Sequence, residues 1–164
     1  AGAAGGFQGV GRRFAITETN GHIRVIDDFA HNPAKIAAAL RAAQGLSCRV
    51  LAVYQPHGFG PTRFLRKEYV AVFREVFRKN DSLYLLPIYY AGGTADKSIS
   101  SDDIARDLYP VAFHVKALRD RRELLADLKA HAKPGDCILL MGARDPSLPA
   151  LSREIVDMCG GRKG

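Results

Sequence analysis

The sequence predicts an α/β fold: a Rossmann-like, open and mostly parallel sheet of about six strands, with helices on both faces and an N-terminal β-hairpin. Short aliphatic or β-branched runs alternate with amphipathic stretches of about a dozen residues, which is the pattern of βα units. The run Cys137 to Met141 is apolar without alternation, as in a central strand that helices cover on both faces. A length of 164 residues fits one such domain.

The first expected element is a β-hairpin near the N-terminus. A strand containing Phe14 and Ile16 on one face is followed by Asn20-Gly21, which supplies a tight turn, and a second apolar strand then begins. The alanine- and glycine-rich residues 1–10 are expected to be a flexible segment or linker. Residues 11–160 are expected to form a single domain.

The remaining elements are expected in βα order. Strands are expected at residues 22–28, 48–55, 82–88, 111–116 and 136–141, and helices at 33–44, 62–78, 101–109, 119–132 and 147–159. Asn32 provides an N-cap for the first helix, and Pro33 begins it at the position where proline's missing N–H costs nothing. The second helix gathers an apolar face at spacings of three and four from Leu65, Tyr69, Val72, Phe73 and Val76.

The chain is basic, with 24 Lys and Arg residues against 17 Asp and Glu and a net charge of +7. Its basic clusters alternate with acidic residues, which is typical of solvated helix faces, and no nucleic-acid-binding motif stands beside them. We therefore expect no nucleic-acid partner. No apolar run is long enough to span a membrane and no signal peptide is evident. We expect no membrane partner and a cytoplasmic location.

The three cysteines, Cys48, Cys137 and Cys159, are widely spaced among apolar neighbours. We expect all three to be packing residues in a reducing compartment. No cluster of Cys and His has the spacing of a zinc or redox site, so no metal site is expected within the chain.

Four loops that follow expected strands carry polar or glycine-rich sequence: Asp27 to Pro33, Gln55 to Thr62, Tyr89 to Thr94 and Gly142 to Pro146. Ligands of open α/β sheets bind outside the carboxyl ends of the strands, so Asp28, His31 and His57 are expected near one another. Each also has a structural interpretation. Asp28 can be a turn acceptor, His31 a structural donor and His57 a surface residue. His31 precedes a helix N-terminus, a place that favours phosphate.

Several catalytic motifs are absent from the sequence. It contains no phosphate-cradling P-loop, no dinucleotide fingerprint, no nucleophile elbow and no zinc-protease motif. The chain by itself therefore lacks an obvious group that would activate a substrate.

The order of several motifs resembles the C-terminal domain of the Mur ligases. The motifs are Gly11-Arg12-Arg13-Phe14, Asp27-Asp28-Phe29-Ala30-His31-Asn32-Pro33, Tyr54-Gln55-Pro56-His57, Ile88-Tyr89-Tyr90-Ala91-Gly92, Gly135-Asp136 and Met141-Gly142-Ala143. The resemblance covers about residues 9–145 and is greatest to the UDP-N-acetylmuramate:L-alanine ligases and the related murein tripeptide ligases. The combination of Asp-Phe-Ala-His-Asn-Pro with Gln-Pro-His one βα unit later is its specific feature.

The resemblance implies one domain of a three-domain, ATP-dependent amide ligase in peptidoglycan synthesis or recycling. In that family an N-terminal domain binds UDP-N-acetylmuramate, a central domain carries the P-loop, and the C-terminal domain closes over ATP and brings the amino acid or peptide. ATP and Mg²⁺ serve to phosphorylate the substrate carboxylate, and the amine then attacks the acyl phosphate. This chain alone is expected to be inactive, with Mg²⁺ bound mainly by the central domain.

The resemblance also implies roles for individual side chains. The catalytic group is Asp28, His31 and His57. The group that faces the ATP phosphates is Arg12, Arg13 and Asn32. The group that binds the amino acid is Phe29, His57 and Arg63. The sequence departs from the alanine ligases where they carry two arginines after Gln-Pro-His, because this chain has Gly58 and Pro61. Arg63 is the expected substitute. Phe29 is the residue that the tripeptide ligases carry at this position, and Gly93 stands where the alanine ligases tend to carry a glutamate. The sequence therefore does not decide which amino acid or peptide is the acceptor.

Two other classes of function remain as alternatives. A stand-alone module that binds a nucleotide or a peptidoglycan precursor would bind its ligand without partner domains. A basic nucleic-acid-binding domain would show an affinity that falls steeply with salt. An upstream region of about 300 residues that contains a P-loop would distinguish the ligase from both, because such an enzyme requires that ATP site.

Overall fold

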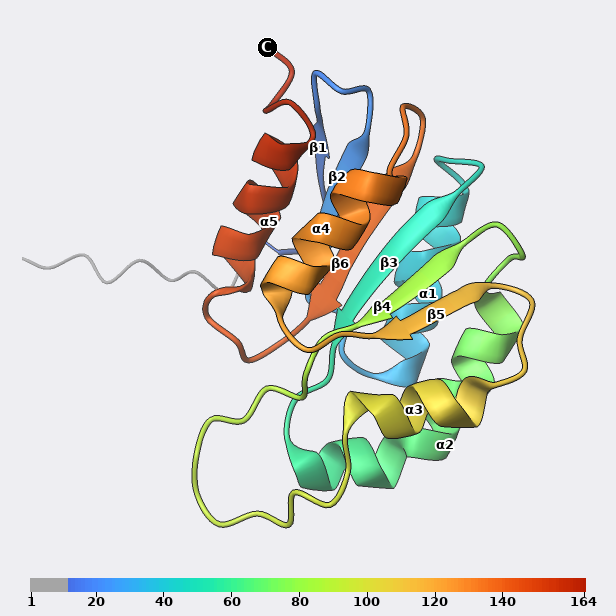
Figure 1. Cartoon of the computed structure of the whole chain (residues 1–164), viewed down its shortest axis with the longest axis vertical. Helices are drawn as coiled ribbons and strands as arrows, with labels where there is room; N and C mark the ends of the chain where they lie inside the picture. The colour runs from blue at the N-terminus through green and yellow to red at the C-terminus, as the bar shows by residue number, and fades with distance from the viewer. Residues whose placement is uncertain (1–11) are drawn as a thin grey trace, which may run out of the picture.

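The computed structural model describes residues 12–164, so the expected linker at residues 1–10 lies outside the described residues. Its six-stranded sheet has the order β1-β2-β6-β3-β4-β5 (Figure 1). β1 and β2 pair antiparallel as a hairpin, and all other pairings in this sheet are parallel. The predicted fold class, a mostly parallel α/β sheet with an N-terminal hairpin, is confirmed.

Each expected element is present close to its expected position. The strands are β1 (Ala15–Glu18), β2 (Arg24–Asp28), β3 (Val50–Gln55), β4 (Ser82–Leu85), β5 (His114–Ala117) and β6 (Cys137–Gly142). The helices are α1 (Pro33–Gln44), α2 (Phe59–Val76), α3 (Ser101–Leu108), α4 (Arg121–His131) and α5 (Leu148–Met158).

Helices cover both faces of the sheet, and each face has its own core. α1, α2 and α3 pack on one face, where Leu40 and Phe73 are fully buried. α4 and α5 pack on the other face through residues such as Leu128 and Ile155. Figure 1 shows α4 in front of the sheet and α1 behind it.

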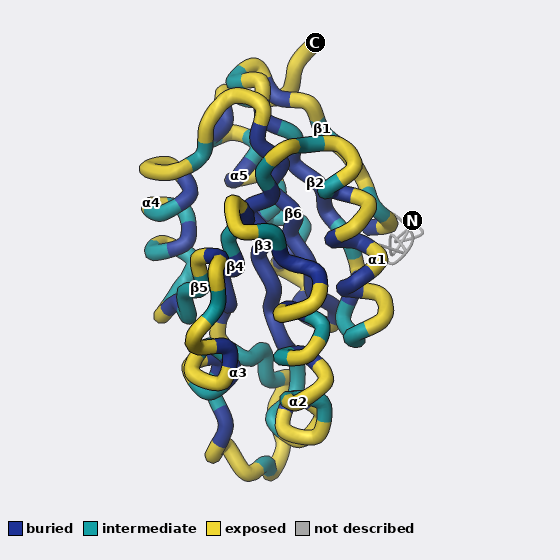
Figure 2. Tube along the Cα trace, turned by 90° about the vertical axis from the view of Figure 1, so that its right-hand side faces the viewer, coloured by how far each residue is buried: buried dark blue, intermediate teal, exposed yellow. Residues whose placement is uncertain are grey.

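The two central strands, β3 and β6, are buried along their whole length, as the dark trace in the middle of Figure 2 shows. Ala52 and Tyr54 of β3 face the core under α1 to α3, whereas Leu51 and Val53 face the core under α4 and α5. Successive side chains of a strand point to opposite faces, so a strand covered on both sides is apolar throughout. This explains the uninterrupted apolar runs in the sequence.

Four strands are shorter than the sequence predicted, β2 and β3 by two residues at their starts, and β4 and β5 by more at one end. β4 ends at Leu85 rather than at residue 88, because Pro87 has no N–H with which to continue the ladder. β5 begins at His114 rather than at residue 111. Its first residue pairs with Ser82, where β4 begins, so residues before His114 have no strand beside them on that side.

Helix α2 begins at Phe59, three residues before the predicted start. Gly58 is its N-cap with φ of +71°, a left-handed conformation that glycine adopts without steric cost. The N–H of Thr62 donates to the Gly58 carbonyl at 3.1 Å, which closes the first turn. The predicted boundary was wrong because the glycines and Pro61 were assigned to the loop, whereas they initiate the helix.

Two of the three cysteines have the predicted packing role. Cys137 and Cys159 are buried, and burial raises the pKa of the Cys137 thiol to about 12. Cys48 is exposed, so its predicted packing role was wrong. It lies in the turn before β3 begins, outside the part of the chain that the sheet buries. No helix within residues 12–164 is long and apolar enough to cross a membrane.

Candidate functional site

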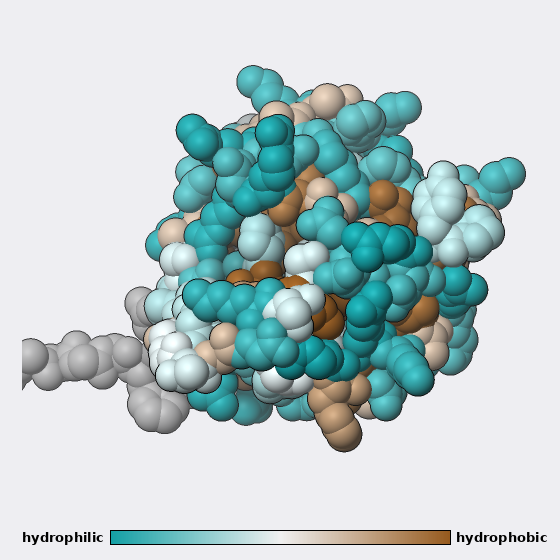
Figure 3. All heavy atoms as spheres, turned by 60° about the horizontal axis from the view of Figure 1, so that its bottom comes forward, coloured by the Kyte–Doolittle hydropathy of each residue, from teal (hydrophilic) through white to brown (hydrophobic). Residues whose placement is uncertain are grey.

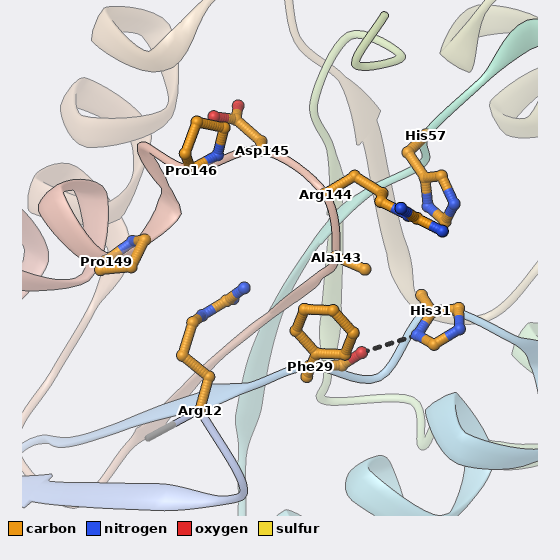
Figure 4. A pocket seen from close by; sticks show the side chains of 9 residues that line it. All are labelled: Arg12, Phe29, His31, His57, Ala143, Arg144, Asp145, Pro146 and Pro149. Atoms are coloured by element: carbon orange, nitrogen blue, oxygen red, sulfur yellow. Dashed lines mark hydrogen bonds between the residues drawn. The ribbon is translucent and has the colours of Figure 1, made fainter. Parts of the chain in front are cut away.

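The carboxyl-terminal ends of the parallel strands open onto a pocket of about 360 Å³, shown in Figure 4. The loops after β2, β3 and β6 converge on it, which is the expected location of a ligand site in an open α/β sheet. We call it the basic pocket, and its lining residues are Arg12, Phe29, His31, His57, Ala143, Arg144, Asp145, Pro146 and Pro149. Figure 3 brings the lower end of Figure 1 forward and shows hydrophobic residues in hollows between hydrophilic ones.

Two histidines lie together in the basic pocket. The ring centroids of His31, after β2, and His57, after β3, are 5.7 Å apart. Nδ1 of His31 lies 2.9 Å from the Phe29 carbonyl oxygen (Figure 4), so Nδ1 carries the proton and Nε2 is left for a ligand. The hydroxyls of Tyr54 and Tyr69 donate to the His31 carbonyl at 3.2 and 2.9 Å. These contacts fix the backbone that carries His31.

His57 is held as a neutral imidazole. Its loop is fixed by a pair of backbone hydrogen bonds to Tyr89, in the segment after β4. Burial lowers the pKa of His57 below its ordinary value of 6.5, and the nearby charges of His31 and Arg144 lower it further. At pH 7 this ring can therefore accept a hydrogen bond or a proton.

Arg12 precedes β1, and its guanidinium already makes hydrogen bonds to other parts of the domain. Its Nε donates to Asp27 at 2.8 Å, and its other nitrogens donate to the backbone carbonyls of Gly142 and Asp28 at 2.9 and 3.2 Å. It also lies 5.9 Å from the ring centre of Phe29. Only 8% of Arg12 is exposed, and the carboxylate of Asp27 balances its buried charge.

Asp28 and Asn32 shape the loop after β2. The two carboxylate oxygens of Asp28 accept hydrogen bonds from the backbone N–H groups of Phe14 and Ala30, both at 2.7 Å. The side chain of Asn32 accepts from the N–H of Lys35 at 2.9 Å and caps α1. The interpretation of Asp28 as a turn acceptor and the predicted N-cap are confirmed. Their roles toward a ligand stay predictions.

A second pocket, of about 630 Å³, lies on the other side of Arg12 and Phe29. We call it the hairpin pocket, and its lining residues are Arg12, Arg13, Phe14, Asp28, Phe29, Ala30, Lys35, Ala38, Ala39 and Ala42. Arg13 and Lys35 are exposed, and neither makes a side-chain ion pair within residues 12–164. Two free cations beside the start of a helix fit the phosphate groups of a nucleotide.

The described part of the chain offers a metal ion no comparable site. Residues 12–164 contain no group of three or more His, Cys, Asp or Glu side chains that could hold one. The carboxylates that line the two pockets already have partners: Asp28 accepts from the backbone N–H groups of Phe14 and Ala30, and Asp145 binds Arg121 and the N–H of Ser147. We therefore assign no magnesium ligand to the described residues.

Comparison with known proteins places the chain in a family. The family model described as "Mur ligase, glutamate ligase domain" matches residues 12–144. The chain belongs to the Mur ligase family. A UDP-N-acetylmuramate–L-alanine ligase of Pelotomaculum thermopropionicum is 41% identical over 142 residues, and one of Dinoroseobacter shibae is 37% identical over 143 residues. These alignments cover 85% and 86% of this chain and 30% of each relative.

Solved Mur ligases share the fold of this domain. A UDP-N-acetylmuramate–alanine ligase from Thermotoga maritima superimposes with a TM-score of 0.63 at 23% identity, covering 92% of this chain and 30% of that one. A murein peptide ligase from Psychrobacter arcticus gives a TM-score of 0.65 at 18% identity, covering 93% and 31%. This Mur ligase domain thus spans about 30% of the length of the curated relatives it matches.

The predicted site residues divide between the two pockets and the surrounding structure. The basic pocket contains Arg12, Phe29, His31 and His57, and the hairpin pocket adds Arg13 and Asp28. Arg63 lines neither of them. Its guanidinium donates to the Asp96 carbonyl at 3.0 Å and to the Ser98 hydroxyl at 2.9 Å, which braces the loop between β4 and α3.

Two residues of the basic pocket, Arg144 and Asp145, were not among the predicted site residues of this Mur ligase domain. Asp145 is buried, and it binds Arg121 at 2.7 Å and the N–H of Ser147 at 2.9 Å. Burial raises its pKa, but hydrogen bonds from Ser147 and the charge of Arg121 lower it below its ordinary value overall. The available signal was their position in a polar loop directly after the central strand β6.

Proposed function

We propose that this chain is the C-terminal domain of a longer ATP-dependent ligase. That enzyme would join UDP-N-acetylmuramate to L-alanine, another amino acid or a peptide, in peptidoglycan synthesis or recycling. The observation that carries the proposal is the basic pocket, where His31 and His57 lie together at the carboxyl-terminal edge of the sheet in a domain of the Mur ligase family. The names of the relatives support the sugar nucleotide and the acceptor class.

The proposed reaction has two steps. The γ-phosphoryl group of ATP moves to the substrate carboxylate, which gives an acyl phosphate and ADP. The acceptor amine then attacks the acyl carbon, the C–N bond forms, phosphate leaves and the amine loses a proton. Neutral His57 can accept that proton, because its lowered pKa keeps it unprotonated at pH 7. ATP needs Mg²⁺ in this chemistry, and we expect its ligands in the other domains.

The two pockets suit the two ligands that this domain would contact. Arg13 and Lys35 of the hairpin pocket would face the phosphates of ATP, with Asn32 and Asp28 holding the loop between the pockets. The acceptor would occupy the basic pocket against Phe29, His31 and His57. Arg12 would fix the geometry of the boundary between the two ligands.

The test is phosphate release by the full-length protein with ATP, Mg²⁺ and UDP-N-acetylmuramate. L-alanine, L-serine, glycine and murein tripeptide are added one at a time. The proposal predicts release that depends on both the sugar nucleotide and one acceptor. No release with any acceptor would contradict it.

A non-catalytic binding module is the second candidate, because the 164 residues contain no P-loop. It predicts micromolar binding of a nucleotide or a peptidoglycan precursor to this chain alone. Such binding, without any phosphate release from the full-length protein, would favour the module over the ligase.

A further inference from the structure

Arg144 is the feature of the basic pocket that the fold itself does not explain. Its backbone has φ of +57°, a left-handed conformation that few residues other than glycine adopt. Its side chain is exposed and makes no hydrogen bond or ion pair within residues 12–164. In Figure 4 it extends from the loop after β6 toward His57. A strained backbone that presents an unpaired charge to a pocket indicates a ligand.

The other charged groups around the basic pocket are already neutralised. Arg12 is paired with Asp27 at 2.8 Å, and Asp145 is paired with Arg121 at 2.7 Å. His57 is neutral at pH 7. Within residues 12–164 the guanidinium of Arg144 is therefore the permanent charge of the basic pocket that has no ion-pair partner, and it favours an anion.

The uncharged lining indicates which kind of anion fits. The pocket is also lined by Ala143, Pro146, Pro149 and the ring of Phe29, which are small or apolar surfaces. Nε2 of His31 and the ring of His57 add two groups for polar contacts. The pocket thus combines one guanidinium that has no partner within residues 12–164, polar neighbours and an apolar wall. Those features match a carboxylate joined to a small carbon skeleton that carries an amine.

A polyphosphate fits this pocket less well. It carries several negative charges, and one guanidinium would balance only part of them. The hairpin pocket instead presents the free cations Arg13 and Lys35 together. A carboxylate needs one guanidinium, which can bind both of its oxygens through two parallel hydrogen bonds.

We propose that Arg144 binds the carboxylate of the incoming amino acid or peptide and so sets the acceptor specificity of this domain. The proposal rests on the proposed ligase function. It makes Arg144 a substrate-binding residue, opposite His57, which faces the acceptor amine. Arg63 would then act only on the loop between β4 and α3, where its hydrogen bonds lie.

The first test is ligand binding to this chain, without catalysis. The His57 ring signals are followed by NMR while L-alanine, murein tripeptide, L-alaninamide or inorganic phosphate is added. We expect a carboxylate acceptor, either L-alanine or the tripeptide, to shift the His57 signals, and L-alaninamide, which lacks the carboxylate, to leave them unchanged. Arg144→Gln should weaken the carboxylate binding by about 10- to 100-fold, the effect of a lost charge-assisted contact.

Two variants keep this test free of folding effects. Arg153→Gln removes an exposed arginine from α5, away from both pockets, and should bind like the wild type. Arg144→Gly suits the left-handed backbone, so this variant should unfold at the same or a higher temperature while losing the carboxylate. Retained binding in Arg144→Gly or Arg144→Gln would overturn the proposal. So would an equal response to L-alaninamide, a response to phosphate alone, or no response to either carboxylate.

The second test uses the full-length enzyme with the acceptor that supports phosphate release. Arg144→Gln should raise the KM for that acceptor by about 10- to 100-fold and leave the KM for ATP unchanged. An increase confined to ATP, or unchanged values for both substrates, would contradict the assignment. A wild-type enzyme that releases no phosphate refutes the ligase function, whereas an active enzyme with an unaffected Arg144 variant refutes only this inference.

Discussion

The two edges of the sheet differ in whether they leave charged and titratable side chains without a partner. At the amino-terminal edge, Asp81 before β4 and Asp136 before β6 bind Arg78 and Arg49 in ion pairs. At the carboxyl-terminal edge, Arg144 has no partner within residues 12–164, and His57 is kept neutral. Paired charges therefore stand at both edges, and the carboxyl-terminal edge adds Arg144 and His57, whose side chains make no hydrogen bond or ion pair within residues 12–164.

Asp81 shows how complete the pairing at the amino-terminal edge is. It is 1% exposed and accepts hydrogen bonds from the N–H groups of Val50 and Arg78, from the Arg78 guanidinium and from the Gln44 amide. Burial raises the pKa of Asp81, but these hydrogen bonds hold it below its ordinary value overall. We therefore expect the amino-terminal edge to contribute more to stability, and the carboxyl-terminal edge to contribute more to the ligand binding proposed above.

The largest expected effect is on stability, from Asp81→Ala. The substitution leaves a buried N–H of Val50 and the charge of Arg78 without their acceptor. It should lower the free energy of unfolding by about 3–5 kcal/mol, as for other broken buried pairs. Urea unfolding measures the change, with Glu154→Ala on the exposed side of α5 as the control. A decrease in the free energy of unfolding no larger than that of the control would contradict the stabilising role of the amino-terminal edge.

Arg12 tests whether pairing, rather than position at one edge of the sheet, decides how much a charged residue stabilises the domain. It lines the basic pocket at the carboxyl-terminal edge, and yet it is paired with Asp27. Arg12→Gln leaves Asp27 with a buried, unbalanced charge, and should lower the free energy of unfolding by about 2–3 kcal/mol. Arg144→Gln, which removes an unpaired and exposed charge, should change it by less than about 0.5 kcal/mol. Equal effects in urea unfolding would show that pairing does not distinguish these two arginines.

His57→Ala should act on substrate binding more than on stability. In the full-length enzyme it should raise the KM for the amino acid or peptide about tenfold, or about 1.4 kcal/mol, and raise the KM for ATP less. His131→Ala, an exposed histidine at the end of α4, is the matched control. An equal effect on both KM values, or none, would remove His57 from the acceptor site.

The smallest expected effect is the pH dependence of stability from His57. Its folded pKa is lowered from 6.5, first by burial, so the unfolded chain binds its proton more readily. The wild type should therefore lose stability relative to His57→Gln as the pH falls below 6.5, and the difference should be constant above it. Urea midpoints between pH 5 and 8 measure this. A difference that grows with rising pH would have the wrong sign.

Much of the fold could be predicted because its signals are local. The apolar run from Cys137 to Met141 and the Asn32-Pro33 cap are each read from neighbouring residues, and both are confirmed. The start of α2 was missed because Gly58 is a cap only through its left-handed backbone, which the sequence does not display.

The site could be predicted only in part. The meeting of His31 and His57 follows from parallel strands, whose carboxyl ends share one edge. The direction of a long side chain depends on distant contacts instead. Arg63 turns to Asp96 and Ser98, and Arg144 enters the pocket from a loop more than eighty residues further along the chain.

The most direct measurement is amide hydrogen exchange of the full-length protein, with and without a non-hydrolysable ATP analogue, UDP-N-acetylmuramate and the acceptor together. We predict slower exchange at residues 29–32, 56–61 and 142–146, the loops of the carboxyl-terminal edge, and unchanged exchange at residues 78–82 and 133–137 of the amino-terminal edge. Unchanged exchange in the three loops, or protection confined to the amino-terminal edge, would contradict the account.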